Sequence, residues 1–119
     1  MPSGSWTVLR YQAADGRVPF DEFVSTLAPQ EKARAVRTVE LLETFGVSLR
    51  EPYAKHLAGT ELWELRVECA RNSFRLLYFA WVNRAFVLLN GFRKKSRRTP
   101  PEEIERAQKY LKDFKERSQ

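Results

Sequence analysis

The sequence of 119 residues has one cysteine, one histidine and no long hydrophobic run. The lone thiol of Cys69 cannot form an intrachain disulfide, which agrees with a reducing compartment. No apolar stretch approaches the roughly 20 residues that a membrane-spanning helix needs. The first ten residues, MPSGSWTVLR, have neither the basic region nor the apolar segment of a secretion signal. We therefore expect a cytoplasmic protein that is not associated with a membrane.

The chain also lacks the residue patterns of common hydrolytic sites. His56 is the only imidazole, which excludes a nuclease that needs two histidines. No spacing of His, Cys and Asp is typical of a metal site, and no carboxylate cluster is expected beside the basic residues. A Gly-rich phosphate loop and a nucleophile elbow are absent as well. We expect no metal and no cofactor, so any catalysis has to come from arginine and lysine.

The residues that are present predict one compact domain over residues 1–119. Hydrophobic residues make up 43% of the chain and charged residues 30%, with few glycines and prolines. This length is enough for one hydrophobic core. The chain has no internal repeat and no stretch long enough to link two domains.

The hydrophobic patterns predict an α+β fold: an N-terminal strand, a helical hairpin, an antiparallel β-meander of three strands and a C-terminal helix. The expected strands are 5–12, 62–68, 73–81 and 84–92, and the expected helices are 19–27, 29–45 and 100–115. The second helix would have an apolar stripe made of Ala35, Val36, Val39, Leu42 and Phe45. Thr99 and Glu102 form the pattern of a capping box before the last helix.

Positive charge is concentrated in one stretch of the sequence. Residues 66–98 contain nine Lys/Arg and one acid, a net charge of +8, whereas the rest of the chain has a net charge of −2. A hairpin centred near Ala70–Arg71 sets Arg66 opposite Arg75, and the next hairpin sets Arg75 near Phe92 and Arg93. Opposed like charges destabilise a sheet by about 0.2–1 kcal/mol per pair. We interpret the cluster as a site for a polyanion.

Several of these residues have simpler alternative interpretations. Glu64 and Glu68 would share a face with Arg66 and neutralise it, although two acids are too few for seven nearby cations. Arg97 and Arg98 would be solvated loop charges. Phe92 would be either a platform for base stacking or an ordinary core residue.

An arginine and lysine cluster supports one reaction without a metal ion. Arginine binds phosphate through two parallel hydrogen bonds and stabilises developing negative charge. A lysine among other cations has its charged form disfavoured, which prepares it to act as a base. RNA supplies its own nucleophile, the 2′-hydroxyl, which DNA lacks. The residues therefore predict metal-free transesterification of RNA.

The order of the motifs KHLAGTELWELR, FRLLYF and VLLNGFRKKSRRTPPEEIERA resembles the HigB-like, phage-derived branch of the RelE/ParE toxin superfamily. The resemblance runs from Ser5 to Tyr110. It implies the toxin of a type II toxin–antitoxin system, a metal-independent endoribonuclease that cleaves mRNA on the ribosome. It also implies a cognate helix-turn-helix antitoxin, so that operator DNA is contacted only through the antitoxin.

Together with the charge pattern, the resemblance assigns roles to individual residues. The catalytic residues would be Arg66, Arg75, Lys94 and Lys95, and the RNA-binding residues would be Lys55, His56, Phe92, Arg93, Arg97 and Arg98. The general base stays open between the two lysines, with the histidine less favoured. Some relatives place a substrate-stacking tyrosine where this chain has Thr99 and Pro100, and we interpret Tyr110, further on, as a helix-packing residue.

Two other functions stay open at this point. A non-enzymatic toxin of the ParE branch would inhibit DNA gyrase, without needing converging basic residues. A relative that binds RNA without cleaving it would show strongly salt-dependent binding. The antitoxin would cover the basic residues with an acidic segment or dock on apolar residues of the first two helices.

Overall fold

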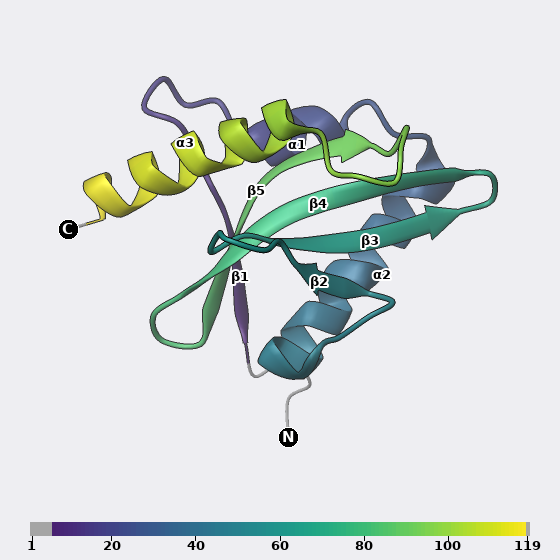
Figure 1. Ribbon diagram of the computed structural model, residues 1–119, viewed down its shortest axis with the longest axis horizontal. Coiled ribbons are helices and arrows are strands. Elements are labelled where there is room, and N and C mark those ends of the chain that lie inside the picture. Colours follow the sequence, from purple (N-terminus) through teal and green to yellow (C-terminus); the bar gives the residue numbers. More distant parts are fainter. Residues whose placement is uncertain (1–5, 119) are drawn as a thin grey trace.

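A five-stranded sheet with helices on both faces forms the protein (Figure 1). The computed structural model describes residues 6–118. The strands are β1 (Thr7–Arg10), β2 (Ala54–His56), β3 (Trp63–Cys69), β4 (Asn72–Trp81) and β5 (Ala85–Arg93). The helices are α1 (Pro19–Val24), α2 (Pro29–Phe45) and α3 (Pro101–Arg117), with a 3₁₀ turn η1 (Gly46–Ser48). The predicted α+β class is confirmed.

The strands lie in the order β1-β5-β4-β3-β2. The sheet therefore contains one strand more than predicted. β2 lies in a stretch that was expected to be a connection, and it pairs antiparallel with β3. A strand of three residues is too short for its alternation to be detected in the sequence. β1 pairs parallel with β5 and is shorter than the predicted strand, whose first residue, Ser5, lies outside the described residues.

Two hydrophobic cores form, one on each face of the sheet. Ala35 and Leu42 of α2 belong to one core, and Ala107 and Leu111 of α3 belong to the other. Figure 1 shows the two helices on opposite sides of the sheet. The central strands β4 and β5 are therefore covered on both faces, which explains why their sequences are almost continuously apolar.

Two details of the predicted helices are wrong. Val36 and Phe45 are exposed, so they do not belong to the stripe with which α2 contacts the sheet. Thr99 does not cap α3, because Pro100 is the N-cap residue and no side chain caps that end. The Thr99 hydroxyl instead donates a hydrogen bond of 2.8 Å to Oε1 of Glu64 on β3.

A β-bulge interrupts the pairing of β4 with β5. Tyr78 lies opposite Leu88, but two residues earlier on β4, Leu76 lies opposite Gly91. Three steps along β5 therefore correspond to two along β4, so β5 contains one extra residue. Because side chains alternate between faces, this residue reverses the face to which every later side chain of β5 points.

Replacing Gly91 with alanine is expected to lower the free energy of unfolding by about 1–3 kcal/mol, because it overfills the core. A Cβ atom at this position would lie 2.4 Å from Cδ2 of Phe23, whose ring packs on Phe74. Urea denaturation measures the change. The penalty should shrink in a Phe23→Leu background, which makes room for the methyl group. An equal penalty in both backgrounds would contradict the proposed clash.

Candidate anion-binding site

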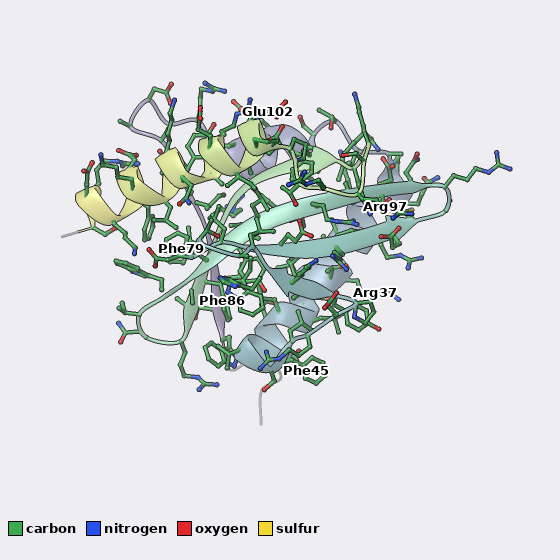
Figure 2. All side chains as sticks on the ribbon, viewed as in Figure 1. Arg37, Phe45, Phe79, Phe86, Arg97 and Glu102 are labelled. Carbon is green, nitrogen blue, oxygen red and sulfur yellow. The ribbon has the colours of Figure 1, made fainter. Side chains whose placement is uncertain are left out.

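Arg66 and Arg75 lie directly opposite each other on β3 and β4, as predicted. With the loop that follows β5 they line a small, partly open cavity of about 10 Å³. Its lining residues are Glu64, Arg66, Arg75, Phe92, Lys94, Ser96, Arg97, Arg98 and Thr99. A cavity of this size holds at most about one water molecule. Figure 2 shows Arg97 on this loop, beside β4.

Arg75 is the buried member of the site, with 5% of its side chain exposed. Its Nη1 atom donates to Oε2 of Glu68 at 3.4 Å and to the carbonyl oxygen of Phe74 at 3.1 Å. Its Nε atom lies 3.9 Å from Oε2 of Glu64. Since a buried charge is stable only with such partners, Arg75 holds the site together and offers little surface to a ligand.

Arg66 is the accessible member of the pair, with 24% of its side chain exposed. Its Nε atom donates to Glu64 at 3.3 Å, and its Nη1 atom donates to Glu51 at 3.3 Å. The expectation that no carboxylate cluster lies beside the basic residues is therefore wrong. Glu64 contacts both arginines, Glu51 contacts Arg66, and Glu68 contacts Arg75. The simpler interpretation, in which Glu64 and Glu68 neutralise Arg66, therefore holds for Glu64 alone.

Glu64 is the central residue that sequence reasoning did not assign to the site. It is buried on β3, accepts hydrogen bonds from Arg66 and Thr99, and lies near Arg75. The only signal in the sequence was its place on the same strand face as Arg66. That signal suggested a neutralising charge, because the sequence does not reveal that the Thr99 loop folds back over it.

The prediction that Arg93 joins this cluster is wrong. The bulge in β5 sets Phe92 opposite Arg75 and Arg93 opposite Phe74, so Arg93 points to the face that α2 covers. There its Nη1 and Nη2 atoms donate to both carboxylate oxygens of Glu31 at 3.0 Å. Without the extra residue, Arg93 would share the face of Arg75.

Glu31 fixes the start of α2 to the sheet and gives the fold a pH dependence. The Arg93 guanidinium, together with the Ala28 backbone N–H and Asn72, lowers the pKa of Glu31 from 4.5 to about 2. A carboxyl group whose pKa is lowered by folding stabilises the protein above its unfolded pKa. This contribution is lost as the pH falls from about 4.5 towards about 2.

Glu31→Gln should therefore make stability depend less steeply on pH in this acidic range, because glutamine does not titrate. Urea denaturation at a series of pH values measures the slope for both proteins. Glu105→Gln, a change at an exposed position of α3, serves as the control and should keep the slope of the unchanged protein. Equal slopes for all three proteins would contradict a lowered pKa at Glu31.

The basic residues of the loop after β5 are exposed. Lys94, Arg97 and Arg98 line the cavity, whereas Lys95 does not. Within residues 6–118 none of these four side chains forms an ion pair. This loop therefore contributes cations that are not neutralised by the protein itself.

The remaining predicted site residues are divided between the two faces of the sheet. Lys55 lies opposite Glu64, so it shares the face of the cavity, but it does not line the cavity. His56 lies opposite Trp63 and packs on that ring on the other face, so it is not part of the site. Phe92 is buried in the core, so it is not a stacking platform. Tyr110 stacks on Tyr11, which confirms a packing role.

Comparison with known protein families matches residues 22–112 to the phage-derived Gp49-like proteins (DUF891). The chain belongs to this family. The matched region runs from α1 into α3 and includes every residue that lines the cavity. Members of the Gp49-like family are commonly RelE/HigB-like toxins, which agrees with the resemblance noted in the sequence. A search of curated proteins finds no match for this Gp49-like protein.

Residues 6–118 of the Gp49-like protein lack two further features. None of its helices there combines the length and the apolar character that crossing a membrane requires. The same part of the chain contains no group of three His, Cys, Asp or Glu side chains that could hold a metal ion.

Proposed function

We propose that this Gp49-like protein is the toxin of a type II toxin–antitoxin system and cleaves mRNA on the ribosome without a metal ion. The cavity carries the proposal, because five cations meet there around a single lining carboxylate, Glu64. Membership of a family that is commonly one of toxins supports the toxin role and suggests an antitoxin as partner. The ribosome and mRNA are proposed as the targets.

An RNA phosphate would bind by replacing the carboxylate of Glu51. Glu51 is exposed, and exposed ion pairs contribute only about 0–1 kcal/mol. A phosphodiester can therefore take its place on Arg66, with Lys94, Arg97 and Arg98 adding charge from the loop. Arginine then stabilises the negative charge that develops on the phosphate oxygens during the reaction.

The proposed reaction needs one group that accepts a proton and one that donates a proton. The ribose 2′-oxygen attacks the neighbouring phosphorus atom, the bond from phosphorus to the 5′-oxygen breaks, and a 2′,3′-cyclic phosphate forms. We assign the proton of the 2′-hydroxyl to the Glu64 carboxylate, and the proton that the 5′-oxygen gains to the Lys94 ammonium. Both residues line the cavity, which Lys95 and His56 do not.

Controlled expression followed by mapping of mRNA 5′ ends tests the proposal. Growth should stop, and new ends carrying a 5′-hydroxyl should appear inside codons of ribosome-bound messages. A Lys112→Ala variant, changed at an exposed position of α3, should behave in the same way. Growth arrest without new ends would refute cleavage as the cause of toxicity.

A second candidate function is RNA binding without cleavage. The carboxylate partners of Arg66 and Arg75 and the small volume of the cavity favour it. Salt-dependent RNA binding with no new mRNA ends on ribosomes would support this candidate. Inhibition of DNA gyrase by the purified protein would instead support a ParE-like toxin.

A further inference from the structure

A second and larger basic groove lies beside the candidate site, between α2 and the segment that leads into β2. Its volume is about 300 Å³. It is lined by Arg34, Arg37, Thr38, Leu41, Pro52, Tyr53, Arg66 and Glu68. Arg66 lines both the groove and the cavity, so the two spaces share this residue.

The groove has an excess of positive charge. Arg34 and Arg37 are exposed and stand three residues apart on α2, which sets them next to each other on the helix surface. Neither guanidinium has an ion-pair partner in the described part of the chain. The acid that lines the groove, Glu68, already accepts a hydrogen bond from Arg75. An anion is therefore the natural ligand of this groove.

The groove also contains an aromatic surface. The Tyr53 side chain is large, apolar and 49% exposed, and Pro52 precedes it. The Tyr53 carbonyl oxygen accepts a hydrogen bond of 2.8 Å from the Arg66 backbone N–H, which fixes the tyrosine next to the shared arginine. Aromatic rings in a positively charged groove are typical of surfaces that bind single-stranded nucleic acid, because bases stack on them.

We infer that this groove binds the stretch of single-stranded RNA next to the phosphate that Arg66 binds. Arg34 and Arg37 bind phosphates, and Tyr53 stacks on a base. The inference rests on the proposed function, because it takes the occupant to be the same RNA strand that Arg66 contacts. In Figure 2 Arg37, on α2, and Arg97, on the loop after β5, lie towards the same end of the view.

Binding of an uncleavable hexanucleotide, with 2′-O-methyl groups throughout, tests the inference. Fluorescence anisotropy at several salt concentrations compares the unchanged protein with the double variant Arg34→Ala/Arg37→Ala. Each phosphate contact contributes about 0.7 to the slope of log affinity against log salt concentration for single strands, so the double variant should lose about 1.4. The loss should be smaller with a dinucleotide, which is too short to fill both spaces.

Two further variants make the result specific. Tyr53→Ala should weaken hexanucleotide binding roughly 10-fold and leave the salt slope unchanged, because stacking involves no counterion release. Lys109→Ala/Lys112→Ala is the matched control, with two exposed cations at the same spacing on α3. It should keep the slope of the unchanged protein.

An equal slope for the two double variants would overturn the inference. Poly-glutamate serves as a probe for an acidic protein partner. If Arg34→Ala/Arg37→Ala lost binding to poly-glutamate but kept its RNA binding, the inference would also be overturned, since the groove would then be a protein interface. Because the assay uses RNA that cannot be cleaved, it separates this inference from the proposed nuclease. RNA binding that depends on the groove, without new mRNA ends on ribosomes, would refute only the proposed cleavage. New mRNA ends, with RNA binding that does not depend on the groove, would refute only the inference about the groove.

Discussion

Arg75→Ala is expected to lower the free energy of unfolding by about 3–5 kcal/mol, the usual cost of removing one partner from a buried ion pair. The substitution leaves the buried carboxylate of Glu64 with Arg66 and Thr99 alone and opens a gap between the strands and the loop. Urea denaturation of the purified protein gives the value. Arg71→Ala, at an exposed position in the turn of the same hairpin, should stay within about 0.5 kcal/mol of the unchanged protein.

A second substitution tests the cause of this loss. Glu64→Gln in the Arg75→Ala background should restore part of the stability, because it removes the buried charge that has lost its partner. Absence of any recovery, or a loss below about 1 kcal/mol for Arg75→Ala alone, would contradict a buried ion pair. A loss of the proposed cleavage in Arg75→Ala would therefore report unfolding rather than chemistry, so Arg75 is a poor residue with which to test cleavage.

Under the proposed function, Arg66→Ala is expected to reduce the rate of mRNA cleavage on ribosomes by about 100- to 1,000-fold, as found when one charge-stabilising donor is removed from an active site. The variant should stay folded, because Arg66 is partly exposed and its removal leaves the hydrogen bond from Thr99 to Glu64 in place. Purified ribosomes, a defined message and primer extension measure the rate, and thermal unfolding checks the fold.

Arg66→Lys and Lys109→Ala complete this experiment. Lysine keeps the charge at position 66 but not the two parallel hydrogen bonds, so an intermediate rate is expected. Lys109→Ala changes an exposed residue of α3 outside the site and should cleave like the unchanged protein. Full cleavage by Arg66→Ala would refute the proposed role of this arginine.

Much of the fold was predictable because its signals are local. The short turn between β3 and β4 determines the register of that hairpin, so the pairing of Arg66 with Arg75 followed from the sequence. Pro29 and Gly46 marked the ends of α2 correctly. β2 was missed because three residues carry no periodic pattern. The predicted capping box does not form, because the Thr99 hydroxyl donates its hydrogen bond to Glu64 on β3.

The sequence by itself determined the α+β fold, the hairpin that joins Arg66 to Arg75, and the concentration of positive charge between residues 66 and 98. Only the tertiary structure decided which of these charges meet. One extra residue in β5 turns Arg93 to the opposite face, where it pairs with Glu31, and the return of the Thr99 loop places Glu64 among the arginines. Side-chain direction depends on pairing between strands, and ion pairs form between residues that are distant in the chain. Neither property leaves a local pattern in the sequence.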